Sequence, residues 1–145
     1  MLTTRRKIRI EWGDCDPGGI VYFPRYFEFF DACTSGLFEA VGLPKALLIK
    51  TYDIVGIPVV DVRASFSVAS RFGDEVEIET SIPEWGRSSF RVKHRLLRGK
   101  TLAVEGWEKR VWVGRHPGDP DALKSRPIPR ELIGRFGADR SDSHG

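Results

Sequence analysis

The fold is decided by one uninterrupted stretch, PRYFEFFDACTSGLFEAVG, at residues 24–42. Pro24 suits the first turn of a helix, because the amide hydrogen that proline lacks would have no partner there. Gly42 suits the end of a helix, because glycine adopts the left-handed conformation at little cost. The stretch therefore predicts a helix from Pro24 to about Val41.

The predicted helix is apolar over more than half of its circumference. At about 3.6 residues per turn, one stripe contains the apolar side chains of Tyr26, Phe29, Phe30, Cys33, Leu37, Ala40 and Val41. A mixed sector beside the stripe contains Phe27, Asp31, Thr34 and Phe38. A helix of this kind needs other structure around most of its surface, and a sheet can provide that cover.

The rest of the chain alternates between apolar and polar residues, as β-strands do. We predict strands at 7–12, 62–68, 76–82, 90–96 and about 101–115, and short helices at about 44–50 and 130–136. Gly106 within the last strand indicates a bulge or a close approach of another element. Most of the strands follow one another through short turns, so they are antiparallel. The predicted fold class is α+β, with a curved antiparallel sheet around one long helix.

Length and composition indicate one globular domain, which we place at residues 1–136. The chain has 145 residues, of which 41% are hydrophobic and 30% charged, and residues 137–145 contain no large apolar side chain, so we expect a disordered tail. No stretch reaches the ~18 apolar residues of a membrane span, and no secretory signal is visible. Two cysteines are too few for a disulfide framework, so we expect a cytoplasmic protein.

Several kinds of site are disfavoured by the sequence. The net charge of +3 comes from dispersed charges, which permits an anionic small ligand but disfavours nucleic-acid binding. We find no phosphate-binding loop and no serine nucleophile motif. His94, His116 and His144 lie in separate segments, so we expect neither a metal site nor another cofactor. Cys15 stands between two aspartates, whose charge disfavours a reactive thiolate.

The loop before the long helix, DCDPGGIVYFP at residues 14–24, carries the strongest candidate site. It places two carboxylates, Asp14 and Asp16, close to a helix start, where unpaired N–H groups stabilise developing negative charge. The N–H of Phe23 is the candidate donor, because Pro24 has none. A carboxylate beside such a donor suits acyl transfer or hydrolysis, as nucleophile or as general base. Alternatively, either aspartate only caps a turn or the helix.

At these residues the sequence resembles the 4-hydroxybenzoyl-CoA thioesterase family of hotdog-fold proteins. The resemblance is carried by EWGDCDPGGIVY at residues 11–22 and continues to Tyr26. Weaker matches follow in the same order at Asp31, 55–58, 64–66, 84–85, 89–90 and 126–129. The family wraps an antiparallel sheet around one long helix, which is the fold class predicted above.

The resemblance implies roles for individual residues. Asp16 matches the catalytic carboxylate, which attacks the thioester or activates water, and Phe23 matches the position whose N–H faces the thioester oxygen. Asp31 matches the residue that accepts a hydrogen bond from the ring hydroxyl of a 4-hydroxybenzoyl group. The predicted helix places Asp31 between Phe27 and Phe38, which would suit the floor of an aromatic pocket; alternatively, Asp31 is a solvated carboxylate. Further substrate-binding candidates are Phe27, Gly19, Arg87, Ser88 and Ser89.

Two departures from the family pattern affect the expected specificity. The family is strongly basic after its Glu-Trp pair, where it meets the phosphates of CoA, whereas this chain has Gly86, Arg87 and Ser88. Lys93, Arg126 or Arg130 would then supply part of the charge. Near Ile57, where this chain is apolar, the family member specific for hydroxybenzoate has a polar residue. The identity of the acyl group therefore stays open.

We therefore expect hydrolysis of an aromatic acyl-CoA to the free acid and CoA. The alternatives are a short- or medium-chain aliphatic acyl-CoA thioesterase and a non-catalytic acyl-thioester binding protein. Dehydration or isomerisation of hydroxyacyl thioesters is disfavoured, because no histidine lies near Asp16 in the sequence. One helix cannot cover both faces of the sheet, so we expect a homodimer. The resemblance extends this expectation to a dimer of dimers, a homotetramer.

Overall fold

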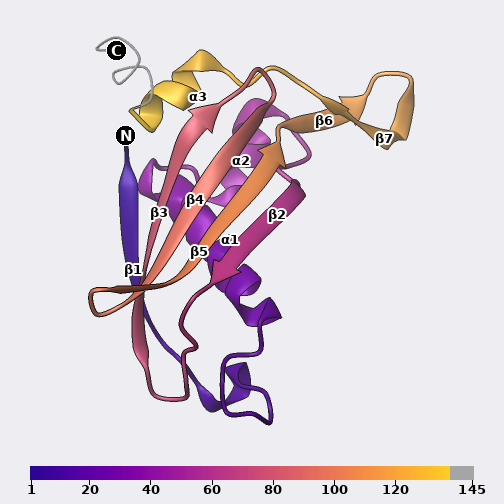
Figure 1. Ribbon diagram of the computed structural model, residues 1–145. Helices are drawn as coiled ribbons and strands as arrows, with labels where there is room; N and C mark the ends of the chain where they lie inside the picture. Colours follow the sequence, from indigo (N-terminus) through magenta and orange to yellow (C-terminus); the bar gives the residue numbers. More distant parts are fainter. Residues whose placement is uncertain (138–145) are drawn as a thin grey trace.

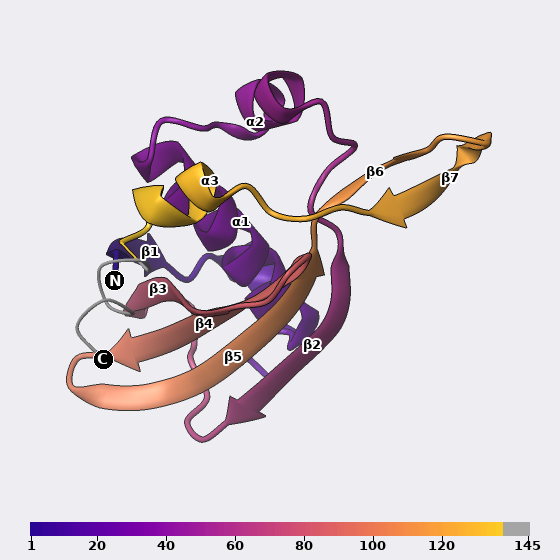
Figure 2. The same cartoon turned by 90° about the horizontal axis from the view of Figure 1, so that it is seen from above.

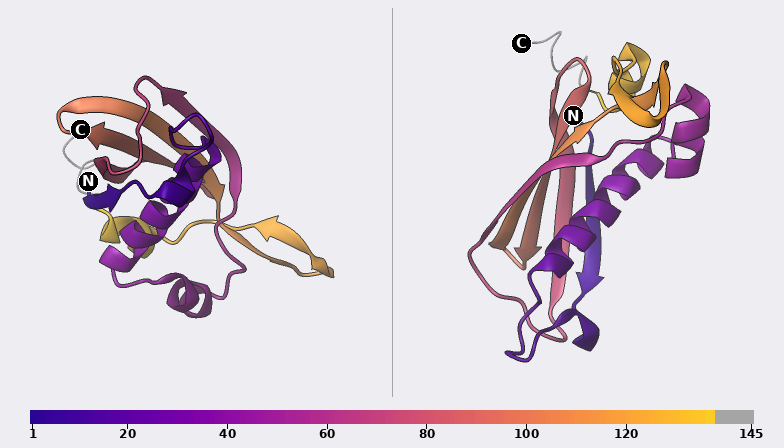
Figure 3. Two further views of the ribbon diagram at one scale, coloured as in Figure 1. Left: turned by 90° about the horizontal axis from the view of Figure 1, so that it is seen from below. Right: turned by 90° about the vertical axis from the view of Figure 1, so that its right-hand side faces the viewer.

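The structure is a computed structural model that describes residues 1–137. A five-stranded sheet wraps around the long helix α1, Pro24–Ala40, which lies against one face of the sheet (Figures 1 and 3). The strand order is β1-β3-β4-β5-β2, and every neighbouring pair is antiparallel. The strands are β1 Thr3–Arg9, β2 Val59–Phe66, β3 Glu75–Trp85, β4 Ser89–Arg98 and β5 Thr101–Val111. This architecture confirms the predicted α+β class.

Smaller elements lie at the ends of the sheet. They are the 3-10 helix η1 Trp12–Asp14, the helices α2 Lys45–Tyr52 and α3 Arg130–Arg135, and the hairpin of β6 Val113–His116 and β7 Asp119–Ser125. The hairpin projects away from the main sheet (Figure 2). Within residues 1–137 no single helix is long and apolar enough to cross a membrane, and α1 with α2 meets that test only as a pair bent by 60°.

Several predicted strand boundaries were wrong, and the strand predicted at 62–68 spans Val59–Phe66. The first strand ends at Arg9, because the 3-10 helix η1 takes up residues 12–14. The predicted strand at 101–115 is two strands separated at Trp112, and the second of them pairs with β7, which was not predicted. Almost all of β7 is exposed, so it has no apolar alternation to reveal it. Of the predicted disordered tail, all but Gly137 lies outside the described residues.

The buried face of α1 is rotated from the predicted stripe. Thr34 and Phe38 are buried, whereas Ala40 is exposed and Phe29 is half-buried. The buried side chains form two apolar clusters: one includes Leu37, Phe38, Phe90, Trp112 and Phe136, and the other includes Tyr26, Phe30, Ile78, Leu96 and Val104. A connected group of buried polar residues lies between α1 and the sheet, namely Thr34, Thr80, His94, Glu108 and Arg110.

The helix packs tightly against β5 at Phe30. A Cβ atom placed on Gly106 would lie 2.4 Å from Cε2 of Phe30, so only glycine fits beneath the ring. The same ring stacks on His94, with centroids 4.6 Å apart. This confirms the close approach predicted at Gly106 and fixes the middle of α1 on the sheet.

Candidate active site

The loop before α1 is a tight turn closed by backbone hydrogen bonds. The N–H of Asp16 donates to the carbonyl of Ile20 at 2.9 Å, and the N–H of Gly19 donates to the carbonyl of Asp16 at 2.9 Å. Gly19 has a φ of +81°, which favours glycine over other residues. The N–H of Val21 donates to Ser70, which ties the turn to the segment after β2.

The two aspartates of this loop have different surroundings. The carboxylate of Asp14 accepts the N–H of Glu11 at 2.9 Å in a capping box and lies 4.0 Å from Nε of Arg25. The Oδ1 atom of Asp16 accepts the N–H of Gly18 at 2.8 Å. The Oδ2 atom of Asp16 makes no hydrogen bond or ion pair with the described residues. Asp14 therefore stabilises the loop, while Asp16 keeps one oxygen free.

The start of α1 also leaves one amide free. Phe23 is the N-cap residue and Pro24 follows it, so the helix contributes no N–H at its first position. The N–H of Arg25 donates to the carbonyl of Tyr22, whereas the N–H of Phe23 has no hydrogen-bond acceptor in the part of the chain that the structure describes. A free N–H at a helix start attracts negative charge.

An apolar cavity of about 290 Å³ lies beside this amide. It is lined by Ile20, Val21, Phe23, Tyr26, Phe66, Ser67, Val68 and Ala69. Asp16 does not line the cavity itself, but it pairs with Ile20, which does. The cavity therefore offers room for an apolar group next to the loop that carries the free carboxylate oxygen.

The structure places Asp31 in a second cavity, two turns further along α1. This cavity, of about 360 Å³, is lined by Asp31, Lys45, Val55, Gly56, Ile57, Pro58, Val59, Arg110, Val113 and Leu123. It shares no lining residue with the cavity at Phe23. Phe27 and Phe38, predicted to flank Asp31, do not line this cavity: Phe38 belongs to one core cluster and Phe27 packs against the other.

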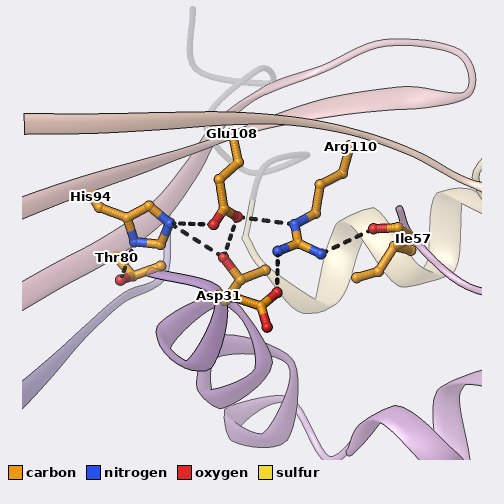
Figure 4. A network of polar contacts seen from close by, with 7 residues as sticks. Asp31, Ile57, Thr80, His94, Glu108 and Arg110 are labelled. Carbon is orange, nitrogen blue, oxygen red and sulfur yellow. Dashed lines mark hydrogen bonds and ion pairs between the residues drawn. The ribbon is translucent and has the colours of Figure 1, made fainter. Parts of the chain in front are cut away.

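Asp31 is the exposed end of a polar network that runs into the core (Figure 4). Nη2 of Arg110 donates to Oδ1 of Asp31 at 2.7 Å, and Nε of Arg110 donates to Oε1 of Glu108 at 2.9 Å. Glu108 also accepts the hydroxyl of Thr34 at 2.6 Å, and its Oε2 lies 3.4 Å from Nε2 of His94. Nδ1 of His94 lies 2.9 Å from the hydroxyl of Thr80.

The network keeps its buried charges paired. Burial alone would raise the pKa of Glu108, but its hydrogen bond with His94 and the charges of His94 and Arg110 lower that pKa to about 2. Burial works against the charge of Arg110, but Glu108 and Asp31 raise the pKa of its guanidinium. Sequence reasoning predicted Asp31 but missed Glu108 and Arg110, although the inward-facing alternation of β5, which carries them two positions apart, was an available signal.

The remaining predicted residues lie at the opposite end of the sheet from the loop of Asp16. Arg87 and Ser88 lie in the turn between β3 and β4, which is beside α3 (Figure 1), and Ser89 is the first residue of β4. The carbonyls of Arg87 and Ser88 accept the N–H groups of Ile128 and Trp112. One chain therefore does not bring this turn to the loop of Asp16.

The other basic residues considered for CoA have separate surroundings. Arg126 donates to the carbonyls of Asp53 and Arg115, which ties the end of α2 to β6. Nζ of Lys93 lies 5.2 Å from the ring centre of Trp107, and Arg130 is exposed at the start of α3. Among residues 1–137 no group of three or more His, Cys, Asp or Glu side chains is arranged to hold a metal ion.

Known proteins share this fold and much of this sequence. Residues 10–136 match the family described as the thioesterase-like superfamily. The chain is 44% identical over 131 residues to the 4-hydroxybenzoyl-CoA thioesterase of Pseudomonas sp. (strain CBS-3), covering 86% of this chain and 91% of that protein. A solved structure of 4-hydroxybenzoyl-CoA thioesterase from the same organism superposes with a TM-score of 0.82 at 33% identity, covering 92% of this chain and 98% of the other. A gentisyl-coenzyme A thioesterase superposes with a TM-score of 0.77 at 29% identity, covering 92% and 99%.

These similarities extend over almost all of the described chain. They include its sheet wrapped around one long helix, which is the hotdog fold expected from the resemblance. The chain therefore belongs to the thioesterase-like superfamily, as its resemblance to the 4-hydroxybenzoyl-CoA thioesterases predicted.

Proposed function

We propose that the protein hydrolyses an aromatic acyl-CoA thioester of the 4-hydroxybenzoyl type to the free acid and CoA. Its family and its 44% identity to a 4-hydroxybenzoyl-CoA thioesterase support an acyl-CoA substrate and this acyl class. The observation that carries the proposal is the loop before α1. There a carboxylate oxygen of Asp16 and the N–H of Phe23 are both without a partner among the described residues.

The free N–H of Phe23 would polarise the thioester carbonyl. As the carbonyl carbon is attacked, its oxygen gains negative charge, and a fixed N–H donor stabilises that charge at no further cost of reorganisation. The positive end of the α1 dipole acts in the same direction. Loss of one such donor in other enzymes lowers the rate about 10²–10³-fold.

Asp16 would drive the attack in one of two ways. As a nucleophile, its free oxygen bonds to the carbonyl carbon, CoA leaves as the thiolate, and water then hydrolyses the mixed anhydride. As a general base, it takes a proton from water while the water oxygen attacks the same carbon. Both routes consume one water and release the acid and the thiol.

A second copy of the chain would complete the site. Within one chain, Phe23 and Asp31 line separate cavities, and the ~12 Å rise from Phe23 to Asp31 along α1 keeps them apart. The edge strand β2 exposes Val59, Val60, Val62 and Phe66. A two-fold axis beside β2 would cover these side chains and would set the loop of one copy towards Asp31 of the other.

We accordingly infer a homodimer that associates further into a dimer of dimers. In this arrangement the turn with Arg87, Ser88 and Ser89 would contact CoA that is bound to another copy. Gly19 would shape the loop of Asp16, and Phe27 would support the acyl group. We also keep the prediction of a cytoplasmic location, which the unpaired state of Cys15 and Cys33 supports.

The test is a thiol-release assay on the purified protein. The substrates are 4-hydroxybenzoyl-CoA, benzoyl-CoA, a short aliphatic acyl-CoA and a long aliphatic acyl-CoA. We expect kcat/KM to be highest for 4-hydroxybenzoyl-CoA. Higher values for an aliphatic substrate would replace the proposed acyl class, and no hydrolysis of any substrate would indicate an acyl-thioester binding protein.

An aliphatic acyl-CoA is the second candidate, because one observation favours it. Apart from Asp31, Lys45 and Arg110, the cavity at Asp31 is lined by apolar residues and glycine. A hydrocarbon chain would be bound by such walls without needing the carboxylate.

A further inference from the structure

Arg110 connects the buried network to the exposed carboxylate of Asp31. The side chain of Arg110 is only 5% exposed, whereas that of Asp31 is 59% exposed. The guanidinium donates to Oε1 of Glu108, to the carbonyl of Ile57 at 3.0 Å and to Oδ1 of Asp31 (Figure 4). Its three acceptors come from β5, from the segment before β2 and from α1, so they fix it from three directions.

The partners of Arg110 are themselves held. Glu108 accepts the hydroxyl of Thr34 and faces Nε2 of His94, and both its oxygens therefore have partners. A charged guanidinium is stable in the interior only where its charge is paired and its N–H groups are bonded. Arg110 consequently has one favourable orientation, in which Nη2 points at Asp31.

This orientation leaves one oxygen of Asp31 available. Oδ1 is bonded to Arg110, and Oδ2 has no hydrogen-bond partner among residues 1–137. Asp31 lines the cavity of about 360 Å³, whose other walls include Val55, Ile57 and Val59. A carboxylate on an unsupported helix surface samples several rotamers, but this one is anchored before any ligand arrives. An anchored acceptor binds a hydrogen-bond donor with less loss of entropy.

We propose that Arg110 is a positioning residue that sets acyl specificity, by holding Asp31 so that its free oxygen accepts a hydrogen bond from a hydroxyl group at the far end of the acyl group. This rests on the proposed function. The preferred ligand is an acyl group that ends in a hydrogen-bond donor, such as a phenol. An acyl group with a methoxy group at that end has no hydrogen to donate to Asp31. An acyl group without any polar group there cannot form the hydrogen bond either.

The experiment compares kcat/KM for 4-hydroxybenzoyl-CoA, benzoyl-CoA and 4-methoxybenzoyl-CoA. In the wild-type protein we expect the hydroxylated substrate to be favoured over benzoyl-CoA about 10- to 100-fold, the range of one hydrogen bond to a charged group. In Arg110→Gln this ratio falls towards one, chiefly through a higher KM for 4-hydroxybenzoyl-CoA. Arg110→Lys restores part of the ratio, because lysine keeps the charge but cannot reach all three acceptors.

Two further variants separate positioning from a purely structural role. Thr34→Val removes one hydrogen bond to Glu108 but leaves all three acceptors of Arg110 in place, so we expect it to keep most of the wild-type ratio. Glu108→Gln/Arg110→Met removes both buried charges together, which avoids an unpaired carboxylate if Arg110→Gln fails to fold. In this double variant too, the ratio of kcat/KM for 4-hydroxybenzoyl-CoA to that for benzoyl-CoA should fall towards one.

The outcomes distinguish this inference from the proposed function. If the wild-type protein hydrolyses none of the three aromatic substrates, the proposed function fails. If it hydrolyses them without favouring the hydroxyl group, or if the folded Arg110 variants keep the wild-type ratio, the function stands and the positioning role is overturned. If the ratio falls as far in Thr34→Val as in Arg110→Gln, the role of Arg110 is structural and the positioning role is overturned.

Discussion

The ring of Phe30 lies directly on the backbone of Gly106, so close that a methyl group at position 106 would stand 2.4 Å from Cε2 of the ring. This contact sets the distance between α1 and β5, because backbone and ring meet with no side chain between them. The ring also stacks on His94, so the contact determines where the buried polar residues meet the helix.

Gly106→Ala should therefore destabilise the protein. Overpacking of a core usually costs about 1–3 kcal/mol, and the ring and the strand would both have to move. The free energy of unfolding, measured in urea, checks this. Gly36→Ala on α1 is the matched control, because a Cβ atom there meets nothing within 4 Å. An equal loss of stability in both variants would contradict the packing argument.

Asp16→Asn should lower kcat by several decades and change KM much less. The amide keeps the shape of the side chain and its bond to Gly18, but it is neither a nucleophile nor a base. Steady-state kinetics with 4-hydroxybenzoyl-CoA measure the effect. Asp14→Asn is the control, since Asp14 serves the capping box, and it should affect stability more than turnover. Near-normal turnover in Asp16→Asn would rule out the assigned role.

Acid should weaken the fold through Glu108. Its pKa is about 2 in the folded protein, against about 4.5 in the unfolded chain, so the ionised form stabilises the folded state. The stabilisation, about 3 kcal/mol, is fully present above pH 4.5 and is lost as the pH falls towards 2. Glu108→Gln should thus lower stability at neutral pH and flatten the decline between these pH values.

Unfolding in urea at a series of pH values measures this decline. Glu28→Gln is the control, because Glu28 forms an exposed ion pair with Arg25 on the surface of α1. Surface pairs contribute little, so this variant should follow the wild-type curve. An unchanged slope in Glu108→Gln would show that other groups determine the acid sensitivity.

Val62→Lys should break the inferred dimer. Val62 lies on the edge strand β2 and is 42% exposed, and a lysine in an apolar contact would have to bury its charge. Light scattering should show a smaller assembly than the wild-type protein, with thioesterase activity lost in parallel because the site needs two copies joined at β2. Leu47→Lys on the outer side of α2 is the control. Full activity in a monomeric Val62→Lys protein would refute the shared site.

The sequence predicted those features that local patterns determine. Pro24 and Gly42 marked the ends of α1, and period-two alternation located β3, β4 and β5 to within a few residues. The hairpin of β6 and β7 escaped prediction, because nearly all of β7 is exposed and one side of a strand must be buried for alternation to develop.

The candidate site was predictable only in part, for a similar reason. The loop with Asp16 and Phe23 is a local segment, so its turn residues and its position before a helix could be read directly. The ion pair between Asp31 and Arg110 joins residues 79 positions apart. No local pattern links them, and the registration of α1 on β5 that brings them together depends on the packing of Phe30 against Gly106.

The polar network that joins Asp31 and Thr34 of α1 to Glu108 and Arg110 of β5 also restricts how the helix docks on the sheet. The fit of Phe30 against Gly106 opposes sliding of the helix, and the buried polar contacts add a second, separate penalty. If α1 slipped by one turn, about 5.4 Å, Thr34 and Asp31 would leave their partners, and Glu108 and Arg110 would each lose a contact in a dry interior. Misdocked arrangements are therefore penalised by unpaired charge, and the native alignment of helix and sheet is separated from its near neighbours by a larger energy gap than apolar packing alone would create.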